Sequence, residues 1–123
     1  MTDMPDQAPS PKQLVAGLVK LLTVETGEDM QFTGRPQKGG VGRVFGGQVI
    51  AQALQAAQLT VGGDKQAHSL HAYFLRGGKE GPPIRYQVTA DFDGRSFANR
   101  RVVASQVEDD GTSRPILNLT ASF

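Results

Sequence analysis

The sequence predicts an α+β domain in which an antiparallel sheet wraps around one long buried helix. The stretch 44–61, VFGGQVIAQALQAAQLTV, contains no Asp, Glu, Lys or Arg, and its apolar residues recur at helical spacing. After Asp64 the hydrophobic period changes to two, which is the period of β-strands. A helix without charge on any face lies inside a protein, and the strands that follow can cover it.

The central helix is expected to run from Gly46 to Val61, a length of about 24 Å at 1.5 Å per residue. Gln48, Gln52 and Gln55 follow one another at spacings of four and three residues, so they form one neutral polar stripe. The glutamines interrupt the apolar run, which is also too short for a bilayer. A transmembrane helix is therefore excluded for this stretch.

The N-terminal part is expected to contain a disordered arm over residues 1–10, followed by a single domain over residues 11–123. Ser10 can cap a helix, Pro11 suits its first position, and Gln13 can complete a capping box. The apolar residues that follow form one face of a short amphipathic helix, which ends near Leu22. This face is expected to pack against another surface.

Four strands are expected after the central helix, arranged as an antiparallel meander. The first, 67–75, is apolar on both faces, which indicates an interior strand and an outer sheet face that needs a partner. In the next, 84–92, apolar and polar residues alternate as in a half-buried strand. Asp93-Gly94 and Asp109-Asp110-Gly111 are hairpin signals. The other expected strands cover 97–107 and 116–123, with a short one at 30–33 before the central helix.

Composition limits the classes of function. The 123 residues provide for one ordinary domain, and a net charge of +1 with mixed signs indicates neither a nucleic-acid nor a membrane surface. The absence of cysteine excludes disulfides, a thiolate nucleophile and cysteine-ligated zinc. The N-terminus carries acidic residues and no apolar core, unlike a signal peptide, so a cytoplasmic protein without a cofactor is expected.

Three runs of the sequence carry a resemblance to a known family. They are Val44-Phe45-Gly46-Gly47-Gln48-Val49, the segment 68–76 (HSLHAYFLR) and the segment 94–102 (GRSFANRRV). Together they resemble the N-terminal half of the TesB-type acyl-CoA thioesterases, the acyl-CoA thioesterase II family, and the likeness extends from about Leu14 to Phe123. The resemblance implies the hotdog fold and the hydrolysis of fatty acyl-CoA to free acid and CoA.

The resemblance covers only the first half of that family. Its members carry two hotdog repeats in one chain, and their catalytic Asp, Thr or Ser, and Gln belong to the second repeat. Those residues correspond to no position in this sequence. The chain is therefore interpreted either as the first half of a larger thioesterase or as a free-standing hotdog, whose partner is a second hotdog domain or a homodimer subunit.

Gly46, Gly47 and Gln48 are the candidates for the thioester site. The first N–H groups of a helix have no acceptor within it, and the helix dipole favours negative charge there, so they suit an oxyanion. Gly46 would let the substrate approach the backbone closely. The Gln48 side chain can orient a water or a thioester carbonyl, but it cannot take a proton at neutral pH. The alternative for the two glycines is tight packing of the helix against the sheet.

A general base requires a carboxylate or a histidine near the attacking water, and the central helix has neither. His68 is the candidate base. His71 lies three residues further along a strand and points to the opposite face, so the two histidines form no metal pair and no metal is expected. A hydrogen-bonded structural role is the alternative for both histidines. Arg100 and Arg101 are candidates for CoA phosphate binding, and a solvated strand face is their alternative.

Two other classes of function stay open at this point. One is a non-catalytic hotdog module for acyl-CoA binding or dimerisation, and the other is a different hotdog enzyme such as a hydratase. The missing acidic residue on the central helix argues against independent catalysis. We therefore expect a thioesterase domain that binds acyl-CoA and depends on a second hotdog unit for its catalytic residues.

Overall fold

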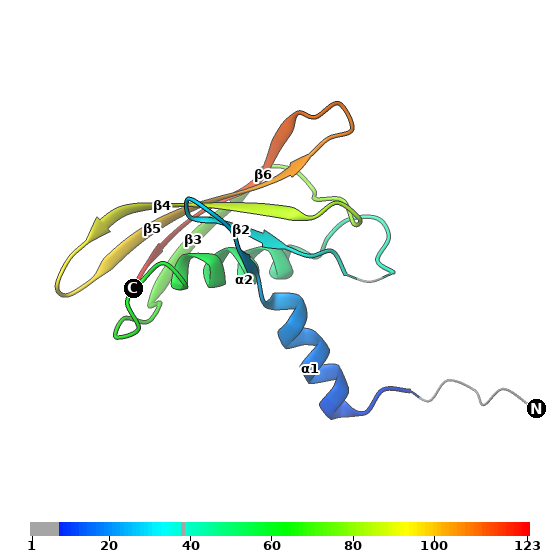
Figure 1. Ribbon diagram of the computed structural model, residues 1–123, viewed down its shortest axis with the longest axis horizontal. Coiled ribbons are helices and arrows are strands. Elements are labelled where there is room, and N and C mark those ends of the chain that lie inside the picture. Colours follow the sequence, from blue (N-terminus) through cyan, green and yellow to red (C-terminus); the bar gives the residue numbers. More distant parts are fainter. Residues whose placement is uncertain (1–7, 38) are drawn as a thin grey trace, which may run out of the picture.

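The computed structural model describes residues 8–37 and 39–123, which form a six-stranded antiparallel sheet and two α-helices (Figure 1). Residues 1–7 of the predicted arm lie outside the described residues. The elements in chain order are α1 (Pro11–Leu22), β1 (Glu25–Thr26), β2 (Gln31–Gly34), α2 (Gly46–Gln58), β3 (Ser69–Phe74), β4 (Ile84–Asp93), β5 (Ala98–Val107) and β6 (Ser113–Ser122).

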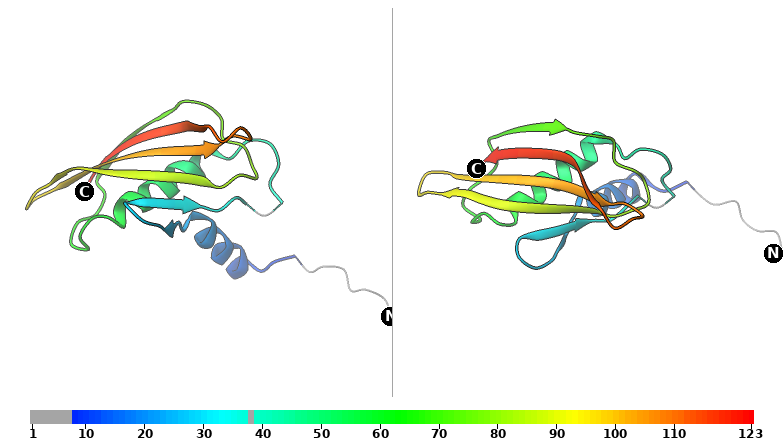
Figure 2. Two further views of the ribbon diagram at one scale, coloured as in Figure 1. Left: turned by 45° about the horizontal axis from the view of Figure 1, so that its top comes forward. Right: turned by 90° about the horizontal axis from the view of Figure 1, so that it is seen from above.

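The order of strands in the sheet is β1-β2-β4-β5-β6-β3. Strands β4, β5 and β6 form the predicted meander, but β3 pairs with β6, from Ser69 opposite Ser122 to Phe74 opposite Leu117. The predictions of a four-strand meander and of an interior first strand are therefore wrong. Figure 2 shows β3 at one edge of the sheet, where one side of its backbone has no strand partner in the described chain.

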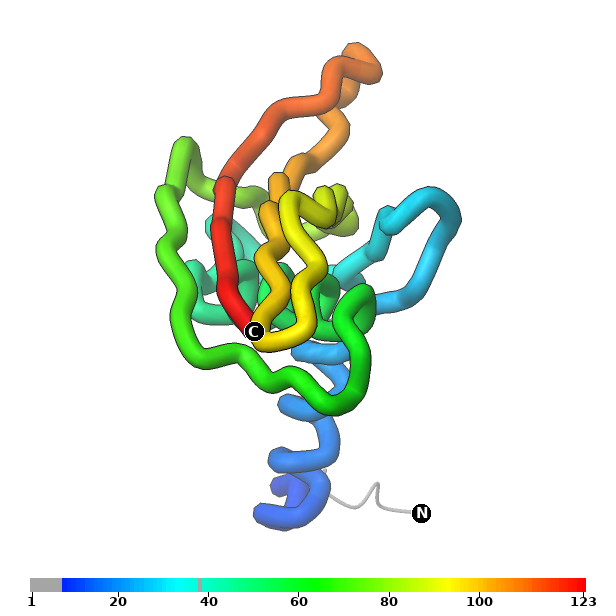
Figure 3. Tube along the Cα trace, turned by 90° about the vertical axis from the view of Figure 1, so that its left-hand side faces the viewer, coloured from blue at the N-terminus to red at the C-terminus, as the bar shows by residue number. Residues whose placement is uncertain are grey.

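Helix α2 lies against the concave face of the curved sheet (Figures 2 and 3). Its alanines are small enough for the strands to approach closely, and Ala53, Ala56 and Ala57 are fully buried. The prediction of a buried helix enclosed by an antiparallel sheet is confirmed. The helix ends at Gln58 rather than Val61, because the next backbone N–H groups bond three residues back, as from Thr60 to Ala57, and close the last turn.

Helix α1 begins as predicted. Ser10 accepts a hydrogen bond from the Gln13 backbone N–H at 3.1 Å, and the Gln13 side chain accepts one from the Ser10 N–H at 2.8 Å, which completes the capping box. The helix projects away from the sheet, and none of its residues is buried (Figure 1). Leu14, Val15 and Leu18 are all exposed in the described chain, so the expected packing of this face against another surface stays a prediction.

The two predicted hairpins, β4–β5 and β5–β6, are confirmed. The regular alternation predicted for β4 holds only in part: Tyr86 and Val88 are buried, whereas Ala90 and Phe92 are exposed. The pairing register of β4 with β5 shifts between Ala90 and Phe92, and the hairpin beyond this bulge extends past the end of α2 (Figure 2). Strand β1, which pairs with β2, was not predicted.

Candidate active site

The start of α2 has free backbone donors. Phe45 precedes the helix in an extended conformation and provides no side-chain cap. The Gln48 N–H bonds back to the Phe45 carbonyl at 3.1 Å. Within residues 8–37 and 39–123, no acceptor is recorded for the N–H groups of Gly46 and Gly47. These two donors stand at the positive end of the helix dipole, which suits a developing oxyanion.

A side chain at either glycine would meet an aromatic ring. A Cβ atom on Gly46 would lie 3.0 Å from Cζ of Phe74 on β3, and one on Gly47 would lie 2.5 Å from Cε2 of Phe45. The sequence offered close substrate approach and close packing as alternatives, and the structure supports the packing role directly. The rings of Phe45 and Phe74, which sequence reasoning did not select, therefore flank the two donors. Phe74 reaches the helix start from β3, and Phe45 belongs to the loop before α2. No local sequence pattern reveals that the two rings lie beside these donors.

Gln48 is only 5 % exposed and lines a groove beside Gly47. Two other glutamines of α2 have structural partners: Gln52 donates to the Leu21 carbonyl at 2.6 Å, and Gln55 accepts from the Val24 N–H at 2.6 Å. For the Gln48 amide the described part of the chain provides no such bond. Its amide is therefore available to a group that enters the groove, which is the position that the predicted role requires.

His68 lies at the other end of β3 from the helix start. Phe74 packs against Gly46, and His68 is six residues away along an extended strand, or about 20 Å at 3.3 Å per residue. The His68 Nε2 atom is 3.0 Å from the Ser122 hydroxyl oxygen, and its backbone N–H donates to the Ser122 carbonyl at 2.9 Å. This distance separates His68 from the donors of its own chain, and its contacts fit the structural alternative.

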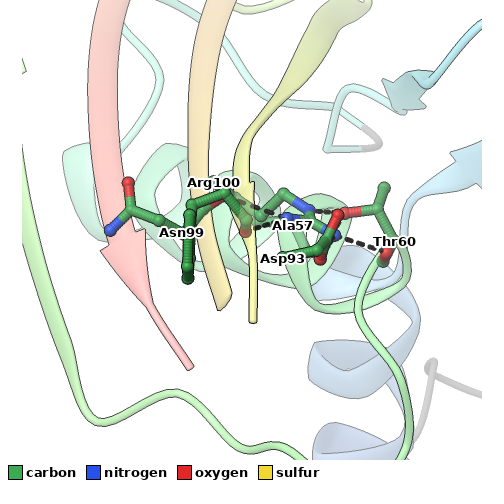
Figure 4. A network of polar contacts seen from close by, with 6 residues as sticks. Ala57, Thr60, Asp93, Asn99 and Arg100 are labelled. Atoms are coloured by element: carbon green, nitrogen blue, oxygen red, sulfur yellow. Dashed lines mark hydrogen bonds and ion pairs between the residues drawn. The ribbon is translucent and has the colours of Figure 1, made fainter. Parts of the chain in front are cut away.

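Arg100 has an interior position that the sequence did not indicate (Figure 4). The residue is 3 % exposed, and its guanidinium group donates five hydrogen bonds. They reach the hydroxyl and carbonyl oxygens of Thr60, the carboxylate of Asp93 at 2.7 Å, and the carbonyls of Phe92 and Asn99. A guanidinium has five N–H groups, so none remains for a phosphate. This geometry corrects both expectations for Arg100, a CoA contact and a solvated face.

Arg101 points to the opposite face of β5 and is exposed. It forms a two-pronged ion pair with Asp91, with distances of 3.2 Å from Nε and 3.1 Å from Nη2 to the carboxylate oxygens. The hydrogen bond from Arg101 lowers the pKa of the Asp91 carboxyl from its ordinary value of 3.8. Since α2 covers the inner face of the sheet, Arg101 and the start of α2 lie on opposite sides of it.

A buried pair connects α2 to the sheet behind the helix start. The Tyr86 hydroxyl donates to Oε1 of Gln52 at 2.5 Å, and burial raises the pKa of Tyr86.

Glu80, in the loop after β3, is the acidic residue that sequence reasoning overlooked near the segment leading into α2. Its backbone N–H donates to the Gly42 carbonyl at 2.8 Å, and one of its carboxylate oxygens is buried without a recorded partner in the described chain.

Comparison with known proteins identifies the family. Residues 35–123 match the family described as "Acyl-CoA thioesterase N-terminal domain". The chain belongs to this family of acyl-CoA thioesterases. The resemblance stated from the three sequence runs is thereby confirmed.

The thioesterase relatives are longer than this chain. It is 41 % identical over 110 residues to acyl-CoA thioesterase 2 of Haemophilus influenzae, a match that covers 89 % of this chain and 37 % of the relative. It is 39 % identical to human acyl-coenzyme A thioesterase 8, over 96 % of this chain and 36 % of that protein. The chain thus spans little more than a third of these relatives.

Solved structures of thioesterases confirm the hotdog fold. The tesB protein of Mycobacterium avium subs paratuberculosis superposes with a TM-score of 0.76 at 34 % identity, covering 89 % of this chain and 42 % of that chain. TesB2 of Mycobacterium marinum, an acyl-CoA thioesterase II, gives a TM-score of 0.72 at 36 % identity, over 86 % and 37 % of the two chains. Neither helix in the described part of this chain has the length and apolarity of a membrane span.

Proposed function

We propose that this chain is the N-terminal hotdog unit of an acyl-CoA thioesterase and that it holds the thioester oxygen during hydrolysis. The observation that carries the proposal is the uncapped start of α2, with the donors of Gly46 and Gly47 beside the groove that Gln48 lines. Family membership supports acyl-CoA as the substrate.

The proposed reaction needs an attacking water, donors for the oxyanion and a base that activates the water. Water attacks the carbonyl carbon of the thioester, the carbonyl oxygen becomes negative, and the N–H groups of Gly46 and Gly47 stabilise it. The C–S bond then breaks, CoA leaves as a thiolate that takes up a proton, and the free acid remains. Helix α2 carries no acidic residue, Glu80 does not line the groove beside Gly47, and His68 lies at the far end of β3. We therefore assign the base that activates the water to a second hotdog unit.

The exposed edge of β3 supports pairing with that second unit. Leu70, Tyr73, Phe74 and Leu75 are all at least 42 % exposed, and an open strand edge with apolar residues readily joins another strand. The second unit is either a further domain of a longer chain or a second copy of this one. We also propose that the protein acts in the cytoplasm. The absence of cysteine from the chain is compatible with this location.

A second candidate function has one observation in its favour. An acyl-CoA-binding hotdog without catalysis would need the groove and the donors but no base, and α2 provides none. The two candidates differ in one result, which is whether bound acyl-CoA releases thiol once a second hotdog unit is present.

The test compares two substitutions of Gly47 that add the same Cβ atom. Gly47→Pro removes the backbone donor, whereas Gly47→Ala keeps it, and the ring of the exposed Phe45 must move in both variants. The chain is joined after Phe123 to the part of the H. influenzae relative that follows the matched region, and thiol release from acyl-CoA is measured. Loss of an oxyanion donor lowers kcat about 10²–10³-fold, so this loss is expected in Gly47→Pro alone.

Equal activity of the two variants would contradict the role of the Gly47 donor. Tight binding of acyl-CoA by the joined protein without thiol release would favour the binding module instead.

A further inference from the structure

Two adjoining hollows share Leu18 and Leu21 of α1, and together they form a groove that follows α1 to the start of α2. Its larger part, about 670 Å³, lies between the Leu14, Leu18 and Leu21 face of α1 and the segment 35–37. Its smaller part, about 280 Å³, is lined by Leu18, Leu21 and Leu22 of α1 together with Phe45, Gly47, Gln48 and Ala51. Leu18 and Leu21 border both parts. The larger part alone falls in the range of small-molecule sites, about 300–1,000 Å³.

The α1 wall of this groove is fixed at its C-terminal end. Gln52 is fully buried and donates to the Leu21 carbonyl, while Gln55 accepts from the Val24 N–H. The preceding turns of α1 reach out from this attachment, away from the sheet (Figures 1 and 2). The wall is therefore held next to the start of α2 and is not a freely moving arm.

The two ends of the groove differ in chemistry. At the α2 end stand the Gly47 donor and the side chain of Gln48, for which no side-chain hydrogen bond is recorded within the described residues. Away from that end most of the lining surface is apolar and includes Leu14, Leu18 and Leu21, and the lining also contains the polar residues Gln13, Lys20, Arg35 and Gln37. A ligand that places a polar carbonyl at Gly47 and Gln48 and continues as an alkyl chain would match this sequence of surfaces.

We propose that the groove between α1 and α2 receives the alkyl chain of the acyl-CoA substrate. The inference rests on the proposed function, because it takes the thioester to lie at the start of α2. It assigns the exposed apolar face of α1, which includes Leu14 and Leu18, to the recognition of chain length. Burial of each methylene group strengthens binding about fourfold, so affinity rises with chain length until the groove is filled.

The test measures binding without hydrolysis, using non-hydrolysable thioether analogues of acyl-CoA with alkyl chains of increasing length. Leu18→Trp places a large side chain in the middle of the groove. Val19→Trp is the matched control, since Val19 is an exposed neighbour on α1 that does not line the groove. We expect the dissociation constant to fall with chain length in the parent chain and in Val19→Trp. In Leu18→Trp this dependence is expected to be lost, with long analogues binding no better than short ones.

A third variant protects the test against a folding defect. A side-chain carbon at Gly17 meets nothing within 4 Å, and leucine is a better helix former than glycine, so Gly17→Leu narrows the groove without loss of α1. Gly17→Leu is expected to weaken the binding of long analogues more than the binding of short ones. A chain-length dependence that survives in Leu18→Trp and Gly17→Leu, or that is lost equally in Val19→Trp, overturns the proposal.

The outcomes for the groove and for the proposed function are separate. If Leu18→Trp abolishes length-dependent binding but the joined protein never releases thiol, the groove binds the alkyl chain and the proposed hydrolysis is wrong. If thiol release needs the Gly47 donor but binding does not depend on chain length, the proposed hydrolysis stands and the role of the groove is wrong. A homodimer that dissociates in Leu18→Trp and Val19→Trp alike, with no length dependence in the parent chain, assigns this face to a second copy instead.

Discussion

At the scale of single residues, the neighbours Arg100 and Arg101 show how strand position determines the role of a charge. Arg100 faces α2 and joins the end of that helix, through Thr60, to Asp93 at the tip of β4. Its positive charge also stands near the negative end of the α2 dipole. Arg101 faces outward and contacts only Asp91 among the hydrogen bonds recorded for its side chain.

We predict that Arg100→Lys destabilises the fold far more than Arg101→Lys. Lysine has three donors and no planar fork, so several of the five buried contacts of Arg100 lose their partner, at a cost of about 2 kcal/mol or more. The exposed pair of Arg101 with Asp91 is screened by solvent and contributes little to stability. Urea unfolding of the two variants measures the difference. Equal midpoints for both would show that the Arg100 network is not important for stability.

The pH dependence of stability is predicted for Asp91. Its pKa is lowered in the folded chain by the hydrogen bond from Arg101, so the carboxylate stabilises the fold above the unfolded pKa of 3.8. This stabilisation is lost as the pH falls through the folded pKa. The Tm difference between the parent chain and Asp91→Asn should therefore be constant near neutral pH and shrink below the unfolded pKa. A difference that grows on acidification would contradict the pairing.

At the scale of elements, the glutamine stripe of α2 determines where α1 is attached. Gln52 bridges the Leu21 carbonyl and the Tyr86 hydroxyl, which come from α1 and from β4. The stripe was visible in the sequence as a neutral polar row. Its partners were not, because they come from elements distant in the chain.

We predict that Gln52→Leu costs more stability than the double variant Gln52→Leu/Tyr86→Phe. The single change leaves the buried Tyr86 hydroxyl without an acceptor, a penalty of about 1–3 kcal/mol, and Tyr86→Phe removes that hydroxyl. Chemical denaturation of the parent chain, both single variants and the double variant gives the coupling energy. Strictly additive changes would show that the two side chains act independently.

Prediction from sequence succeeded where structure is local. The capping box of α1, the buried α2 and the two hairpins each depend on residues a few positions apart, and all were found. The edge position of β3 was missed because its pairing with β6 is decided by strands about fifty residues apart. The burial of Arg100 was missed for the same reason, since Thr60 and Asp93 meet it only in the folded sheet.

At the scale of the whole molecule, the chain forms a complete core and still leaves two apolar surfaces open. One is the edge strand β3, and the other is the α1 face. The first fits a second hotdog unit, and the second fits the alkyl chain of the substrate. Both assignments follow from one physical condition, which is that apolar surface of this extent requires cover.

We predict that Tyr73→Lys on β3 weakens assembly of the chain, because it places a charge on the open edge. Val41→Lys is the control, since Val41 is 89 % exposed in the loop before α2 and belongs to no strand. Sedimentation at micromolar concentration is expected to show a dimer for the parent chain and for Val41→Lys, and dissociation for Tyr73→Lys. A well-folded monomeric parent chain would contradict pairing between copies.

The central claim is that this chain supplies the oxyanion donors and that a second hotdog unit supplies the base. Thiol release from a series of acyl-CoA lengths tests it most directly, on the 123-residue chain alone and on the chain joined to the following part of the H. influenzae relative. We predict turnover by the joined protein and about 10²–10⁴-fold less by the chain alone, the usual effect of losing a general base. Equal turnover by the chain alone, especially if lost in His68→Ala, would contradict the claim.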